Sequence, residues 1–142
     1  MTKLYYHATD KPFDRFDPAM QGTKGATNGY LGVWVGNERS ECEMFGDVLM
    51  TLSVPDVVSY PMAYREIKGL HDHTQFMEDE EAAEFYRAFA RGLMAEGYTV
   101  IDIMEKHYLP SHSIILDLDS IVIESCEILE NEKPSTWGRS SL

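Results

Sequence analysis

The sequence predicts an α+β domain whose strands are mostly antiparallel. Short runs rich in Val, Ile and Tyr recur between turn residues, as is typical of strands. One long segment has the 3.6-residue apolar period of a helix, and three expected strands follow it in succession, an order that is typical of an α+β domain. The 142 residues, 44% of them hydrophobic, suit one domain with a real core. We expect that domain over residues 1–130 and a polar, fraying tail over residues 131–142.

The first third of the chain predicts two strands and a helix. A strand is expected at Lys3–Ala8, which is short and rich in Tyr. Residues 10–30 are rich in Pro, Asp, Gly and Asn, which indicates a long loop. Loops of this length inside a small domain often have a functional role. A second strand is expected at Leu31–Val35. A polar helix should follow over Glu38–Phe45 and end at Gly46.

The middle of the chain contains the clearest strand. Asp47–Val54 is nearly all apolar, and Pro55 ends it. We expect extended chain at Val57–Tyr60 and a short helix at Tyr64–Leu70. His71, Asp72 and His73 follow, and we interpret them as a polar, solvent-facing loop and not as a metal site.

The best helix is expected at Glu78–Glu96. Ala82, Phe85, Phe89 and Leu93 fall on one stripe, which predicts the buried face. The first turn is acidic, which suits the positive end of the helix dipole, and Gly97 should end the helix.

Three further strands are expected after this helix, at Thr99–Met104, Ser113–Asp117 and Ile121–Ile128. The full order is then strand, loop, strand, helix, strand, short helix, long helix and three strands. This order supports the α+β class.

Net charge and composition exclude several function classes. The formal charge is −12 and the pI is near 4.7, which argues against a nucleic-acid backbone or an anionic membrane as the main partner. No apolar run is long enough to span a bilayer, and the first residues lack a signal-peptide pattern. Cys42 and Cys126 have no metal-site spacing and are expected to be reduced thiols. We therefore expect a cytoplasmic protein.

Several motifs together resemble the ADP-ribosyltransferase fold, most closely its small phage, polyvalent-protein and anti-CRISPR-type members. These motifs are His7 at the end of the first strand, the Phe-Asp turn at 13–17, the segment GYLGVWVGNERSECEMFGDVLMTLSV, EGYTVIDI at 96–103 and SIILDLDSIVI. The resemblance covers roughly residues 4–123, and each motif is loose. It implies a split antiparallel β-sheet core with a few flanking helices, and NAD as the substrate that supplies ADP-ribose.

The resemblance also implies roles for residues of the first two strands. His7 would bind the nicotinamide ribose, and the backbone of Ala8, followed by Thr9, would clamp the nicotinamide amide. Trp34 would stack on the nicotinamide ring, and Tyr30 would supply a phenol nearby. From the residues alone, His7 is equally well interpreted as a packing residue, and Trp34 as a core residue. If the resemblance holds, the imidazole and the indole face each other across a cleft.

The catalytic acid is the weakest match. Aligning SIILD with the strand that follows the usual Glu puts His112 or Ser113 at its place, so Glu105 is the candidate and Asp102 the alternative. An acid is needed because cleavage of the nicotinamide–ribose bond passes through an oxocarbenium-like state, which a carboxylate can stabilise. A solvated loop acid is the simpler interpretation of Glu105.

The resemblance predicts an NAD-dependent mono-ADP-ribosyltransferase that modifies a host macromolecule, with a host protein as the expected target. It would be encoded by a phage or mobile element and act against host defence. An alternative is a catalytically inactive acidic binding protein on the same fold, an inhibitor or nucleic-acid mimic, which the −12 charge and the missing Glu favour. A weaker alternative is an NAD glycohydrolase, which uses water as the acceptor.

Overall fold

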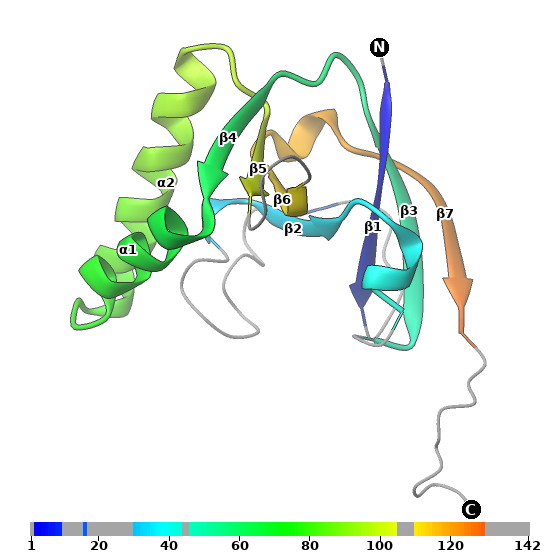
Figure 1. The fold of residues 1–142 in the computed structure, drawn as a ribbon, viewed down its shortest axis with the longest axis horizontal. Helices are drawn as coiled ribbons and strands as arrows, with labels where there is room; N and C mark the ends of the chain where they lie inside the picture. Colours follow the sequence, from blue (N-terminus) through cyan, green and yellow to red (C-terminus); the bar gives the residue numbers. More distant parts are fainter. Residues whose placement is uncertain (1, 10–15, 17–29, 44–45, 105–109, 130–142) are drawn as a thin grey trace, which may run out of the picture.

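A seven-stranded mixed sheet with two helices forms the fold (Figure 1). The structure is a computed structural model that describes residues 2–9, 16, 30–43, 46–104 and 110–129. The strands are β1 (Lys3–Thr9), β2 (Val33–Gly36), β3 (Val48–Val54), β4 (Ser59–Ala63), β5 (Val100–Met104), β6 (Pro110–Ile115) and β7 (Val122–Ile128). The helices are α1 (Tyr64–Thr74) and α2 (Asp79–Ala95), with short 3-10 turns η3 (Arg39–Glu41) and η4 (Leu118–Ser120).

The strand order is β4-β5-β6-β2-β1-β3-β7, and of these neighbours β4 and β5 alone run parallel. The predicted α+β class with mostly antiparallel strands is therefore confirmed. β2 pairs with β6 along four residues, but with β1 only at Tyr6 and Gly36. The sheet thus consists of a β4–β5–β6–β2 half and a β1–β3–β7 half that meet at a narrow junction.

Two hydrophobic cores lie on the two faces of the sheet. On one face, α1 and α2 cover a cluster that includes Ile101, Ile103 and Ile114. On the other, Tyr5, Val33 and Val35 pack with the apolar side chains of β3. β2 contributes to both, because successive side chains of a strand point to opposite faces: Val33 and Val35 join the second core while Trp34 packs against the first. Because both faces of β2 are covered, Val33, Trp34 and Val35 are all apolar.

The buried face of α2 is rotated relative to the predicted stripe. Ala82, Tyr86, Ala90 and Leu93 are buried, whereas Phe85 and Phe89 are only partly buried at the border of the core. The buried face thus combines small alanines with Tyr86 and Leu93, and the two phenylalanines lie at its border. Gly97 ends the helix as predicted, with a φ of 99° that a glycine adopts without strain.

The predicted polar helix at Glu38–Phe45 is wrong in the described residues, which contain only the three-residue turn η3. Tertiary contacts explain this. The buried Cys42 thiol donates to the Tyr6 carbonyl at 3.2 Å, and a Cβ on Gly46 would lie 2.6 Å from the Thr9 carbonyl oxygen. The chain must therefore approach β1 twice within a few residues, which a continuous helix does not allow.

The segment His71–His73 is also different from the prediction. It lies in the last turns of α1 and not in a loop, although all three side chains are exposed. Both cysteines are free thiols, Cys42 buried and Cys126 exposed. In the described ranges, no helix has the length and apolar character required to cross a membrane.

Candidate functional site

His7 lies at the β1–β2 junction and is held there by the backbone of β2. Its Nδ1 is 3.0 Å from the Trp34 carbonyl oxygen, and its ring meets Phe16 edge-on with centroids 5.4 Å apart. Burial lowers the pKa of His7 below its ordinary value, against a smaller opposing effect of the hydrogen bond to Trp34. The imidazole is therefore neutral near pH 7. Since a carbonyl only accepts, Nδ1 carries the proton and Nε2 is the acceptor nitrogen.

The side chain of Trp34 lies on the face of the sheet opposite to the one that carries the His7 ring. The indole packs against the core under α1 and α2, and the register places it opposite Ile114. His7 is opposite Met50 of the other core, and its neighbour Phe16 packs there too. His7 therefore meets the Trp34 backbone, but the two rings pack against different cores. The expectation that the imidazole and the indole face each other across a cleft is wrong, because successive side chains of a strand point to opposite faces of the sheet.

The other predicted residues divide between the same two regions. Ala8 and Thr9 follow His7 in β1 and pair with Leu49 and Val48 of β3. Tyr30 lies on the helix side with Trp34. Glu105 lies outside the described residues, so its predicted role stays a prediction.

Asp102 is part of a polar row that crosses three segments of the sheet. Ser113 Oγ donates to Asp102 Oδ1 at 2.7 Å, and Asn37 Nδ2 donates to Ser113 Oγ at 3.1 Å. Ser113 is fully buried. The fully buried hydroxyl of Tyr5 has no hydrogen-bond partner among the described atoms, and burial together with the charge of Asp102 raises the pKa of Tyr5. Of the two predicted acids, Asp102 is the one for which the structure gives contacts.

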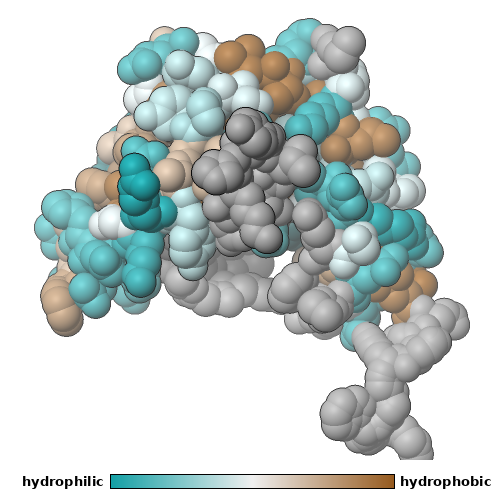
Figure 2. Space-filling model, in the orientation of Figure 1, coloured by the Kyte–Doolittle hydropathy of each residue, from teal (hydrophilic) through white to brown (hydrophobic). Residues whose placement is uncertain are grey.

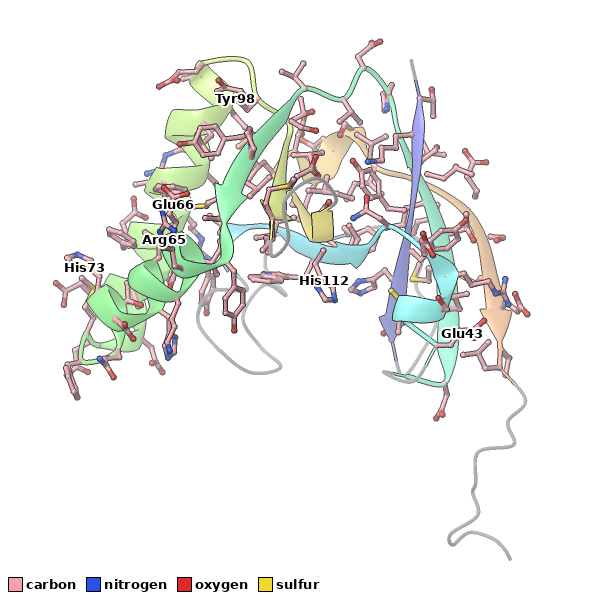
Figure 3. The ribbon with its side chains drawn as sticks, in the orientation of Figure 1. Glu43, Arg65, Glu66, His73, Tyr98 and His112 are labelled. Carbon is pink, nitrogen blue, oxygen red and sulfur yellow. The ribbon has the colours of Figure 1, made fainter. Side chains whose placement is uncertain are left out.

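The residues aligned with the usual Glu differ in their surroundings. Ser113 is a link of this polar row, whereas His112 is partly buried on β6 opposite Gly36 and Ile103. Figure 3 shows His112 projecting from beneath β2. Neither is an acid, so the structure offers no carboxylate at this aligned position.

A pocket of about 270 Å³, which was not predicted from the sequence, lies between α2 and the segment Leu116–Asp119. The Arg87 guanidinium stands over the Tyr30 ring, 4.7 Å from its centroid, at the edge of this pocket. Arg91 and Asp119 also line it. The arginines are four apart on α2, so a helical wheel could have placed them together, but not opposite the η4 turn.

The excess of acidic over basic side chains is distributed unequally over the chain. The described residues contain eighteen acidic and six basic side chains, and the remaining segments contain six of each, so the whole charge of −12 comes from the described residues. One exposed acidic group lies on the α1–α2 hairpin: Glu66, Asp72, Glu78, Asp79, Glu80, Glu81, Glu84 and Glu96. A second lies beside β3 and β7: Glu43, Asp47, Glu124 and Glu127. Figure 3 shows Glu43 on the side of the molecule opposite the hairpin.

Several described basic side chains are already engaged with the protein's own groups. Arg39 contacts Glu43 at 2.8 Å and Glu127 at 2.7 Å, and Arg91 contacts Glu84 at 2.6 Å. These pairs are exposed, so each contributes little to stability. They do, however, reduce the positive charge that is available to an outside ligand.

No known protein-family model matches the chain, and no curated protein sequence matches it. Among solved structures, one described as the crystal structure of an anti-CRISPR protein is similar in fold. The similarity covers 91% of this chain and 96% of that one, with a TM-score of 0.48 and 12% sequence identity. These values describe a distant likeness of the chain trace, so the function has to be argued from the residues themselves.

Proposed function

We propose that this protein acts by binding, and that its acidic surface docks onto a basic protein partner. The observation that carries the proposal is the excess of eighteen acidic over six basic side chains in the described residues. A surface of this sign attracts cationic surfaces and speeds their encounter. Carboxylates also form the same ion pairs with Arg and Lys as nucleic-acid phosphates do. A partner whose basic groove otherwise holds nucleic acid is therefore the expected target, and the protein would block that groove.

A heparin-enriched protein fraction tests this function. Proteins from a bacterial lysate that heparin resin retains are passed over the immobilised protein, and the bound partner is identified and titrated. We expect a stoichiometric partner whose affinity falls with salt and which duplex DNA or RNA displaces. Binding that does not depend on salt, or no partner in that fraction, would contradict the proposal.

Charge-neutralised variants sharpen the test. Glu78→Gln with Glu80→Gln removes two exposed carboxylates from the hairpin and should weaken binding chiefly by slowing association. Arg65→Gln with Lys68→Gln removes two exposed positive charges from the same hairpin and is the matched control, which should leave binding unchanged or strengthen it. Equal losses in both variants would indicate a general structural effect instead of charge recognition.

A second candidate is NAD-dependent mono-ADP-ribosyl transfer to a host protein, and the geometry of His7 favours it. A neutral imidazole whose Nδ1 donates to the Trp34 carbonyl has Nε2 as its acceptor nitrogen, and an acceptor nitrogen is the kind of group that can bind a ribose hydroxyl. Asp102 or Glu105 would supply the carboxylate that stabilises the positive charge on the sugar as nicotinamide leaves.

Labelled NAD incubated with the protein and lysate separates the two candidates. Label on a host protein that is lost in His7→Ala and in either Asp102→Asn or Glu105→Gln supports transfer. Release of nicotinamide without labelled protein supports the glycohydrolase alternative instead. Neither transfer nor release, together with partner binding that His7→Ala leaves unchanged, supports the binding function alone.

A further inference from the structure

The turn between α1 and α2 displays an apolar side chain at the end of the helical hairpin. Phe76 is 93% exposed, the largest value among the large apolar side chains of the described residues. Figure 1 shows this turn at the far end of the two helices, away from the sheet. In Figure 2 an apolar patch lies at that end of the molecule, bordered by hydrophilic side chains. An exposed benzyl group gains free energy only when another surface buries it.

The turn that carries Phe76 is fixed by hydrogen bonds. Thr74 is only 3% exposed, and its Oγ1 lies 3.0 Å from the Leu70 carbonyl and 3.2 Å from the His71 carbonyl. The Tyr86 hydroxyl is 3.0 Å from the same Oγ1, and it is the donor when the single Thr74 proton goes to either carbonyl. The Met77 amide then donates to the Thr74 carbonyl at 3.0 Å, which closes the turn around Phe76. Little backbone freedom remains to be lost when Phe76 is buried, and such preorganisation favours binding.

Exposed carboxylates surround this side chain in sequence. Asp72 precedes the turn by one helical turn, and Glu78 to Glu81 follow it directly. An aromatic anchor with a charged rim is the usual arrangement of a binding hot spot, in which the anchor enters a pocket and the rim fixes orientation.

We propose that Phe76 anchors the protein to its partner by entering an apolar pocket bordered by Lys and Arg side chains. This inference rests on the proposed binding function and names the part of the surface that makes the contact. The acidic rim steers the partner, and burial of the ring slows dissociation. Added salt should therefore lower the association rate. Truncation of Phe76 should instead raise the dissociation rate.

A photocross-linker at position 76 tests the proposal. p-Benzoylphenylalanine replaces Phe76 in the full chain, or Val58 as a control on the loop between β3 and β4 that is 47% exposed. Each protein is irradiated with the heparin-retained fraction, and the linked residue of the partner is mapped. In parallel, Phe76→Ser and Phe76→Leu are titrated with the partner so identified, and their melting temperatures are compared with that of the parent.

The proposal predicts adducts from position 76 that map to an apolar pocket with a basic rim. It also predicts a loss of affinity on the order of tenfold or more in Phe76→Ser, partly restored in Phe76→Leu, with unchanged melting temperature. A salt-sensitive partner that binds Phe76→Ser within about twofold of the parent, or that links mainly from position 58, overturns the anchor but leaves the binding function. Absence of any salt-sensitive partner overturns the binding function itself, and the anchor with it.

Discussion

The hydrogen bond between Thr74 and Tyr86 predicts an unequal pair of substitutions. Tyr86→Phe removes the donor, but Thr74 Oγ1 keeps its bond to the Leu70 carbonyl. The cost should be that of one hydrogen bond, about 1 kcal/mol of the free energy of unfolding. Thr74→Val instead leaves the buried Tyr86 hydroxyl without the partner that the structure gives it. A stranded buried hydroxyl raises the cost to about 2 kcal/mol.

The double variant follows from the same reasoning. When both hydroxyls are removed, no buried donor is left unsatisfied, so the two changes should cost about 1 kcal/mol less together than the sum of the single costs. Urea denaturation of the four proteins, with the slope of each transition compared, measures these differences. Additive costs, or a Tyr86→Phe that is as destabilising as Thr74→Val, would refute the assignment of Tyr86 as the donor. Agreement between the measured and the expected free energies would confirm that the Thr74–Tyr86 hydrogen bond helps to fix the turn that carries Phe76.

Two further predictions concern the junction and the packing of the sheet. Gly32→Ala should destabilise strongly or prevent folding, because its Cβ would lie 2.3 Å from the Ile115 carbonyl oxygen; Gly92→Ala on α2, with open space around it, should stabilise by about 0.5–1 kcal/mol. Thermal melts of both variants provide the measurement, and similar effects would contradict the close approach at Gly32. Burial lowers the pKa of His7 in the folded state, so the unfolded chain binds this proton more readily and stability is lost as pH falls below about 6.5. Denaturation from pH 8 to 5 should show this loss reduced in His7→Gln; an identical pH profile for that variant would assign the slope to other groups.

Much of the secondary structure could be predicted from the sequence. Asp47–Val54 and Glu78–Glu96 were predicted within one residue at each end of β3 and α2, because an unbroken apolar run and a 3.6-residue period are local signals. The helix predicted at Glu38–Phe45 failed because contacts of Cys42 and Gly46 with β1, distant in sequence, determine the path there. Local preference was overridden by tertiary contact.

The candidate site was less predictable than the strands. His7 could be selected as a candidate, but the hydrogen bond from its Nδ1 to the Trp34 carbonyl depends on how β1 meets β2. The link of Asp102 through Ser113 to Asn37 joins residues that are far apart in the chain. No periodicity or spacing encodes such a row, because strand order is decided by the packing of the whole sheet.

The sequence by itself determined the acidic charge, the α+β class and most positions of strands and helices. These properties follow from composition and from the alternation of apolar residues along a few neighbouring positions. Only the tertiary structure decided that Trp34 and His7 pack against different cores, that Arg87 covers Tyr30 beside a pocket, and that Phe76 stands exposed on a clamped turn. Each of these depends on which distant segments are neighbours in space, and that is set by the burial of two cores on opposite faces of one sheet.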